Sequence, residues 1–142
     1  MTTEAPFDID DRKTYEFSKT LTAEDVEAFA QVSGDNQPIH LDDVQAAKTR
    51  FKKRIAHGIL TAGVISAAIG TQVAPGKVVI YMGQTLNFLA PVYLGDTVTA
   101  KLSVISTNAP RRQATLLATV VNQDGVEVLK GESRIMIEAY DD

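Results

Sequence analysis

The sequence predicts a single α+β domain in which an antiparallel sheet wraps around a buried central helix. The first observation is a stretch of apolar and small side chains, residues 59–69, in the middle of the chain. The second is a C-terminal half rich in Val, Ile, Thr and Leu that turn signals divide into four strands. The third is the length of 142 residues, which suffices for one sizeable core but not for two ordinary enzymatic domains.

The N-terminal segment, residues 1–11, is acidic and polar, and has neither a basic start nor an apolar run. We therefore expect a flexible tail rather than a signal peptide, followed by one domain over residues 12–142. Residues 12–20 alternate apolar and polar side chains, which predicts a half-buried strand. A helix is predicted over residues 23–33, because Thr22 and Asp25 have the spacing of a capping box and Gly34 follows as a stop signal.

The centre of the chain combines a turn-rich loop with helices. Residues 33–40, SGDNQPIH, predict a loop, and Asp42 can cap a short helix that extends to Lys48. Gly58 begins the central helix, which has no face suited to water and should end within residues 73–76.

The remaining residues predict strands at about 77–90, 96–107, 112–123 and 126–138. An Asp-Gly pair at 124–125 is a strong signal for a hairpin between the last two. The open edges of such a sheet need cover, so we expect a homodimer that joins edge to edge.

Composition excludes several classes of protein. A net charge of -4 disfavours nucleic acid and anionic membranes as partners. The longest apolar stretch is shorter than the about 20 residues that span a bilayer. The absence of cysteine excludes disulfides and cysteine-ligated zinc, which suits a cytoplasmic location.

The candidate catalytic residues lie between the predicted loop and the central helix. Asp35 and His40 can converge on one cavity if the loop folds back, with His40 as general base and Asp35 holding a water and passing on its proton. The amide of Gly58, at the start of the central helix, can stabilise negative charge on a carbonyl oxygen. These three functions suit the addition of water to a double bond conjugated to a thioester.

Other candidates have a structural interpretation beside the functional one. Ser66 can orient the catalytic pair or simply permit close helix packing, and His57 can support the site or only cap and pack. A basic run precedes the central helix and can bind the phosphates of CoA or of a carrier arm, or form a solvated face. Its members are Lys48, Arg50, Lys52, Lys53 and Arg54.

Three motifs together resemble the MaoC-like (R)-specific enoyl-CoA hydratases. They are SGDNQPIH, AHGILTAGVISAAIG and GQTLNFLAPVYLGDTV, in matching order along nearly the whole chain. The resemblance implies a hot-dog fold, a homodimer with its sites at the interface, and no metal or separate cofactor, since CoA enters as part of the substrate. By motif position, it implies Asp35 and His40 as the catalytic pair and Gly58 as the oxyanion donor. Ser66 matches a serine of the polyhydroxyalkanoate-linked relatives.

One position departs from the family pattern, because Gln37 stands where the family loop usually has Asn. The implied activity is reversible hydration of trans-2-enoyl-CoA to (R)-3-hydroxyacyl-CoA. The alternatives are a (3R)-hydroxyacyl carrier-protein dehydratase, a hot-dog acyl-CoA thioesterase and a non-catalytic acyl-CoA-binding module.

Overall fold

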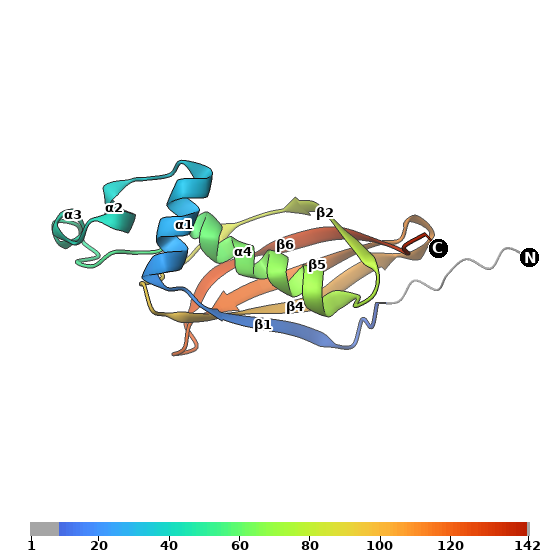
Figure 1. Cartoon of the computed structure of the whole chain (residues 1–142). Helices are drawn as coiled ribbons and strands as arrows, with labels where there is room; N and C mark the ends of the chain where they lie inside the picture. Colours follow the sequence, from blue (N-terminus) through green and yellow to red (C-terminus); the bar gives the residue numbers. More distant parts are fainter. Residues whose placement is uncertain (1–8, 142) are drawn as a thin grey trace, which may run out of the picture.

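A curled antiparallel sheet carries the long helix α4 along one face in the computed structural model, which describes residues 9–141 (Figure 1). Its main strands have the order β1-β4-β5-β6-β2, and the short strand β3 also pairs with β6. The strands are β1 Thr14–Thr20, β2 Val78–Gln84, β3 Asn87–Phe88, β4 Thr97–Asn108, β5 Gln113–Val121 and β6 Glu127–Glu138. The predicted α+β class with a sheet wrapped around a helix is therefore confirmed.

The core lies between the sheet and α4 (Gly58–Ala68). Alternate residues of β5 are buried, among them Leu116 and Val120, as the two-residue period of a strand requires. From the helix, Val64 and Ile65 are buried against this layer. Each such aliphatic side chain stabilises the fold by about 1.5–3 kcal/mol.

Helix α1 (Ala23–Ser33) has the ends that the sequence predicts. The Asp25 N–H donates to the Thr22 hydroxyl over 3.1 Å, and the Thr22 N–H donates to the Asp25 carboxylate over 3.0 Å. At the other end, Gly34 adopts the left-handed region with φ 84°, where a side chain would be strained. The helix therefore stops where the candidate catalytic loop begins.

The loop expected over residues 33–40 is shorter than predicted, because Pro38–Leu41 form the helical turn α2. Pro38 occupies the first helical position, where its fixed φ and missing N–H are favourable. The prediction of a loop through His40 was wrong for that reason. The next helix, α3 (Asp43–Ala47), is capped by Asp42 as predicted.

Helix α4 is buried on one side only within the single chain. Thr61, Val64, Ile65 and Ala68 are buried, whereas Ile59 is 57% exposed and Ser66 is also exposed. The helix continues as a π-helical turn, Ile69–Val73. No helix in the described part of the chain is long and apolar enough to cross a membrane.

The single strand expected over residues 77–90 is divided into β2 and β3. The chain leaves the ladder around Thr85, whose N–H still donates to the Glu132 carbonyl oxygen over 2.9 Å while the Glu132 N–H donates to the Thr85 hydroxyl. The sequence in this region is strand-like throughout, so its side chains do not reveal the interruption. The other three predicted strands are confirmed within one or two residues at most ends.

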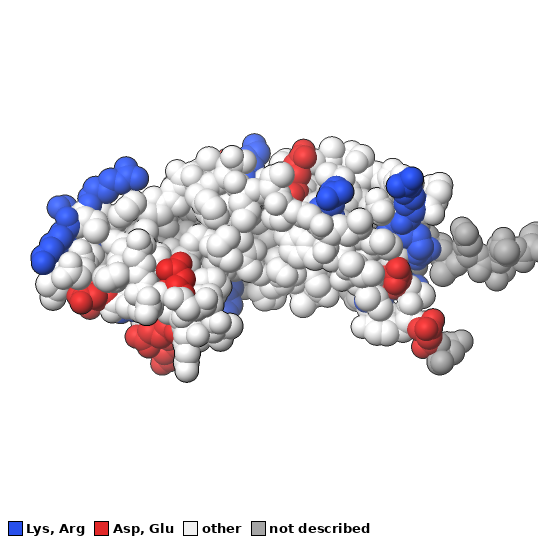
Figure 2. Space-filling view, turned by 90° about the horizontal axis from the view of Figure 1, so that it is seen from above, with Lys and Arg blue, Asp and Glu red and all other residues white. Residues whose placement is uncertain are grey.

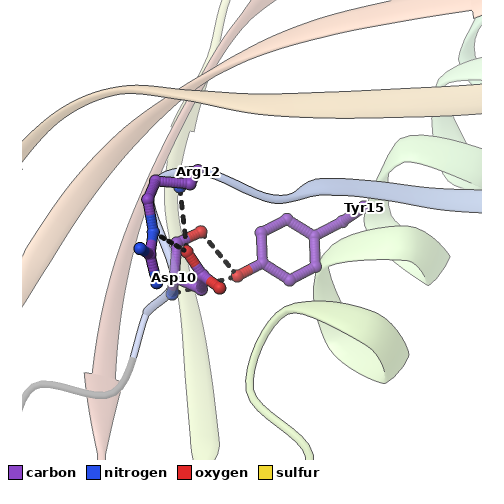
Figure 3. Close-up of polar contacts among 3 residues, drawn as sticks. All are labelled: Asp10, Arg12 and Tyr15. Carbon is purple, nitrogen blue, oxygen red and sulfur yellow. Dashed lines mark hydrogen bonds and ion pairs between the residues drawn. The ribbon is translucent and has the colours of Figure 1, made fainter.

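The first described residues are attached to the sheet through Tyr15 (Figure 3). Its buried hydroxyl donates to the Asp10 carbonyl oxygen over 3.0 Å, and the Asp10 N–H donates to the same hydroxyl. The Arg12 N–H lies 2.9 Å from the Asp10 carboxylate and lowers its pKa. Of the tail expected over residues 1–11, residues 1–8 lie outside the described residues, and residue 10 is held by these contacts.

Candidate active site

A cavity of about 640 Å³ opens where the end of α1, the start of α4 and residues 88–92 meet. Asp35, His40, His57 and Gly58 all line it. The structure therefore brings together the predicted pair, the predicted oxyanion glycine and the second histidine of the chain. Reactive groups of Asp35, His40 and His57 lie within 4.8 Å of one another.

His40 is buried, with 7% of its surface exposed, and its ring has a defined orientation. Its Nδ1 lies 2.7 Å from the carbonyl oxygen of Ile55. Because a carbonyl oxygen only accepts, Nδ1 carries the proton, and in the neutral ring the lone pair is on Nε2. The Arg54 Nε–H donates to the His40 carbonyl oxygen over 2.7 Å and so fixes the backbone as well. This arrangement leaves Nε2 as a proton acceptor.

Asp35 is exposed and follows the left-handed Gly34 that ends α1. Its N–H donates to the Ser33 hydroxyl over 3.1 Å, and its carboxylate accepts a long hydrogen bond of 3.4 Å from the Gln37 N–H. Gln37 thus contributes its backbone to the loop, a contact that the replacement of Asn by Gln leaves available. The carboxylate remains accessible to a water or substrate in the cavity.

His57 connects the two candidate catalytic residues. It is 2% exposed, and its Nε2 donates to the carbonyl oxygen of Asp35 over 2.8 Å. Its ring stacks on His40 with centroids 3.8 Å apart and contacts Phe29 at 4.7 Å. Its Nδ1 is buried and has no hydrogen-bond partner among residues 9–141. The structure therefore places His57 at the centre of the site rather than at its margin.

Gly58 begins α4, and the first bond of the helix runs from the Thr61 N–H to the His57 carbonyl oxygen. The amides of residues 58–60 consequently have no acceptor within the helix, and His57 supplies no side-chain cap. A Cβ at position 58 would lie 2.6 Å from the ring of Phe88. The glycine thus keeps an amide at the cavity and also makes room for Phe88.

The group of Asp35, His40 and His57 has the residue types of a metal site but not a favourable ring geometry. Two of the four ring nitrogens donate to backbone carbonyls. The rings are stacked with an interplanar angle of 26°, so their lone pairs do not point at one nearby position. Hydrogen bonding and proton transfer fit this arrangement better than joint ligation of an ion.

The remaining candidate site residues, Ser66 and the basic run, differ in whether they reach the cavity. Ser66 lies on the exposed face of α4 and does not line the cavity. In the basic run, Arg50 lines the cavity, whereas Arg54 points inward to the His40 backbone and lies 3.8 Å from Glu27. The Lys53 ammonium lies 4.8 Å from the centroid of the Tyr93 ring.

Basic side chains lie at the end of the molecule formed by α2 and α3, with acidic side chains close by, and further basic side chains lie at the opposite end (Figure 2). Lys48 is the C-cap residue of α3 and Lys52 has a left-handed φ of 66°. Both belong to the segment that contributes Arg50 and Phe51 to the cavity wall, but neither lines the cavity. Arg50 is thus the member of the run with direct access to the site.

Sequence reasoning missed Phe29, Ser33 and Phe88 as parts of the site. Phe29 lies within the helix predicted over residues 23–33, and Ser33 lies at its end, where the motif SGDNQPIH begins. The Phe88 segment was a motif of the family resemblance without an assigned function. Its place in the motif GQTLNFLAPVYLGDTV was the feature of the sequence that could have identified Phe88 as a site residue.

The comparisons with known proteins agree with this geometry. Residues 7–125 match the family model of the MaoC like domain. A 3-hydroxybutyryl-CoA dehydratase from Methylorubrum extorquens is 46% identical over 84% of this chain and 74% of the relative. An (R)-specific enoyl-CoA hydratase from Rhodospirillum rubrum is 40% identical over 93% of this chain and 90% of the relative.

The fold is also similar to that of a solved hydratase. The unliganded R-hydratase PhaJ1 from Pseudomonas aeruginosa has a TM-score of 0.86 and 41% identity, over 95% of this chain and 86% of that one. The expected hot-dog arrangement is therefore confirmed. Together with the match over residues 7–125, the similarity shows that the chain belongs to the MaoC-like family.

Proposed function

We propose that this protein is an (R)-specific enoyl-CoA hydratase, which adds water reversibly to trans-2-enoyl-CoA to give (R)-3-hydroxyacyl-CoA. The observation that carries the proposal is the convergence of Asp35, His40 and the start of α4 on one cavity. It is supported by relatives named for the two directions of this reaction on CoA thioesters.

Addition of water requires one proton to be removed from the water and one proton to be delivered to C2. His40 Nε2 takes a proton from a water that the Asp35 carboxyl orients, and the resulting hydroxide forms a bond to C3. The C2–C3 double bond opens toward the thioester, whose oxygen accepts from the Gly58 N–H at the positive end of α4. The proton that His40 took from the water then passes to C2 by way of the Asp35 carboxylate, which hands it on.

These steps add one water and leave both side chains as they began. No electron leaves the substrate, so the chemistry requires no redox group, and CoA takes part only as the carrier of the acyl chain. His57 and Arg54 position the pair through the backbones of Asp35 and His40.

The CoA phosphates are proposed to lie beside the basic run. Arg50 faces the cavity, and Lys48, Lys52 and Lys53 belong to the same segment. Arginine suits phosphate because its guanidinium donates two parallel hydrogen bonds. We assign Arg54 to the support of His40 instead, because its guanidinium is already engaged there.

The proposal is tested with crotonyl-CoA, by following the loss of the conjugated enoyl absorbance and determining the configuration of the product. Asp35→Asn and His40→Gln should each lower kcat at least about a hundredfold, in the range that general acid–base catalysis contributes. Asp124→Asn, in the exposed β5–β6 turn, is a matched control that should retain activity. Wild-type activity in both pair variants would overturn the assignment.

The same preparation distinguishes the other functions. Release of free thiol from acyl-CoA would indicate a thioesterase, and turnover only of carrier-bound substrate would indicate a carrier-protein dehydratase. Binding of acyl-CoA without any product would indicate a non-catalytic module.

A further inference from the structure

A second cavity, of about 470 Å³, lies between β1, α1 and α4. Its walls are mostly apolar: α1 contributes Ala28, Phe29 and Val32, and α4 contributes Leu60 and Val64. Among the described residues that line it, the charged ones are Lys19 and Asp25, which form an ion pair with a 3.3 Å contact. Because these charges neutralise each other, the cavity suits an uncharged apolar ligand.

Within the described part of the chain, Phe29 is the one residue that lines both cavities. In the candidate active site its ring contacts the ring of His57, with centroids 4.7 Å apart and an interplanar angle of 57°. From the last turns of α1, the same side chain also forms a wall of the second cavity. The ring of Phe29 therefore lies between the catalytic group and an apolar space.

We propose that the second cavity is a latent subsite for the distal carbons of an acyl chain, and that Phe29 determines the accepted chain length by closing it off. This inference rests on the proposed hydratase function. With Phe29 present, the acyl chain is confined to the first cavity, and longer chains lose the burial that the second would provide.

A substitution at Gly63 can test independently whether the acyl chain uses the second cavity. It lines the second cavity but not the first, and a Cβ at this position would have no neighbour within 4 Å. A leucine at position 63 can therefore occupy the cavity, and leucine favours a helix more than glycine does. Gly63→Leu should fill the subsite without loss of the fold.

The experiment compares kcat/KM for trans-2-enoyl-CoA substrates of four, six, eight and ten carbons. Phe29→Ala should raise the ratio of the eight-carbon to the four-carbon value at least about tenfold, because each methylene that becomes buried is worth about a fourfold gain. The double variant Phe29→Ala with Gly63→Leu should return this ratio toward the wild-type value. Val126→Ala, at the exposed β5–β6 turn, serves as the control for loss of an apolar side chain.

The outcomes separate this inference from the function on which it rests. If the wild type does not hydrate crotonyl-CoA, the proposed function fails. If the wild type does hydrate crotonyl-CoA, but Phe29→Ala lowers kcat/KM equally for all chain lengths, Phe29 only supports His57 and the subsite is refuted. A gain on long chains that Gly63→Leu does not reverse would also refute it, since the chain would then lie elsewhere.

Discussion

His57 acts on Asp35 through a single hydrogen bond, from its Nε2 to the Asp35 carbonyl oxygen, while its ring stacks on His40. Substitution should separate these two contributions. His57→Phe keeps an aromatic ring beside His40 but removes the donor, so the loop that carries Asp35 loses its anchor. His57→Gln restores a donor at a similar reach but not the ring.

We expect His57→Phe to lower kcat at least about tenfold, because displacement of a catalytic group costs rate more than binding. KM for crotonyl-CoA should change little, and His57→Gln should recover part of kcat. Steady-state kinetics of both variants measure this division. An equal loss of kcat in His57→Phe and His57→Gln, or a change in KM alone, would contradict a positioning role for the hydrogen bond.

The convergence of the candidate catalytic residues on one cavity could be predicted from the sequence, whereas the contacts that hold them could not. Asp35 and Gly58 stand beside a helix stop and a helix start, which are local signals. The bond from Arg54 to the His40 backbone spans 14 positions, and that from His57 to Asp35 spans 22. Such contacts depend on how the elements pack, so side-chain type and local spacing do not identify them.

At the scale of elements, the capping box of α1 has a pH-dependent contribution to stability. The backbone N–H of Thr22 lowers the pKa of Asp25, with smaller contributions from the Thr22 hydroxyl and Lys19. A carboxyl whose pKa is lower in the folded state stabilises the fold above its unfolded pKa. That stability is lost as the pH falls through the folded value, which lies below 3.8.

Asp25→Asn should therefore reduce the free energy of unfolding at pH 7 by about 0.3–1 kcal/mol, the usual range for a charge at a helix start. The difference from the wild type should disappear below the folded pKa, where Asp25 is protonated. Urea unfolding at pH 7 and at pH 3 or lower measures it. If the difference in free energy of unfolding between the two proteins were the same at both pH values, the charge of Asp25 would not contribute to stability.

Element ends show why sequence patterns succeed or fail. Thr22, Gly34 and Asp42 cap helices through bonds to neighbouring residues, so these helix ends could be predicted. Pro38 is compatible with both a turn and a first helical position, and the structure selects the second. The interruption between β2 and β3 arises from the pairing of Thr85 with β6, which the strand-like residues around it do not disclose.

At the scale of the whole molecule, several of the exposed apolar side chains lie at one edge of the sheet and on α4. Ile80, Tyr81 and Met82 of the edge strand β2 are each 37–38% exposed, and Ile59 of α4 is 57% exposed. An unpaired edge strand with apolar side chains favours pairing with another chain. We propose that two copies join through β2, which would also cover the exposed face of α4.

Ile80→Lys should prevent this association, because a lysine on an edge strand opposes edge-to-edge pairing. Sedimentation should give about twice 15.4 kDa for the wild type and 15.4 kDa for the variant, with Val126→Lys in the distant β5–β6 turn behaving like the wild type. Because a partner that binds only the folded chain stabilises it by mass action, the wild-type Tm should rise with protein concentration and that of Ile80→Lys should not. A monomeric wild type would show that the β2 edge has no partner chain. A variant that still sediments as a dimer would place the dimer interface elsewhere.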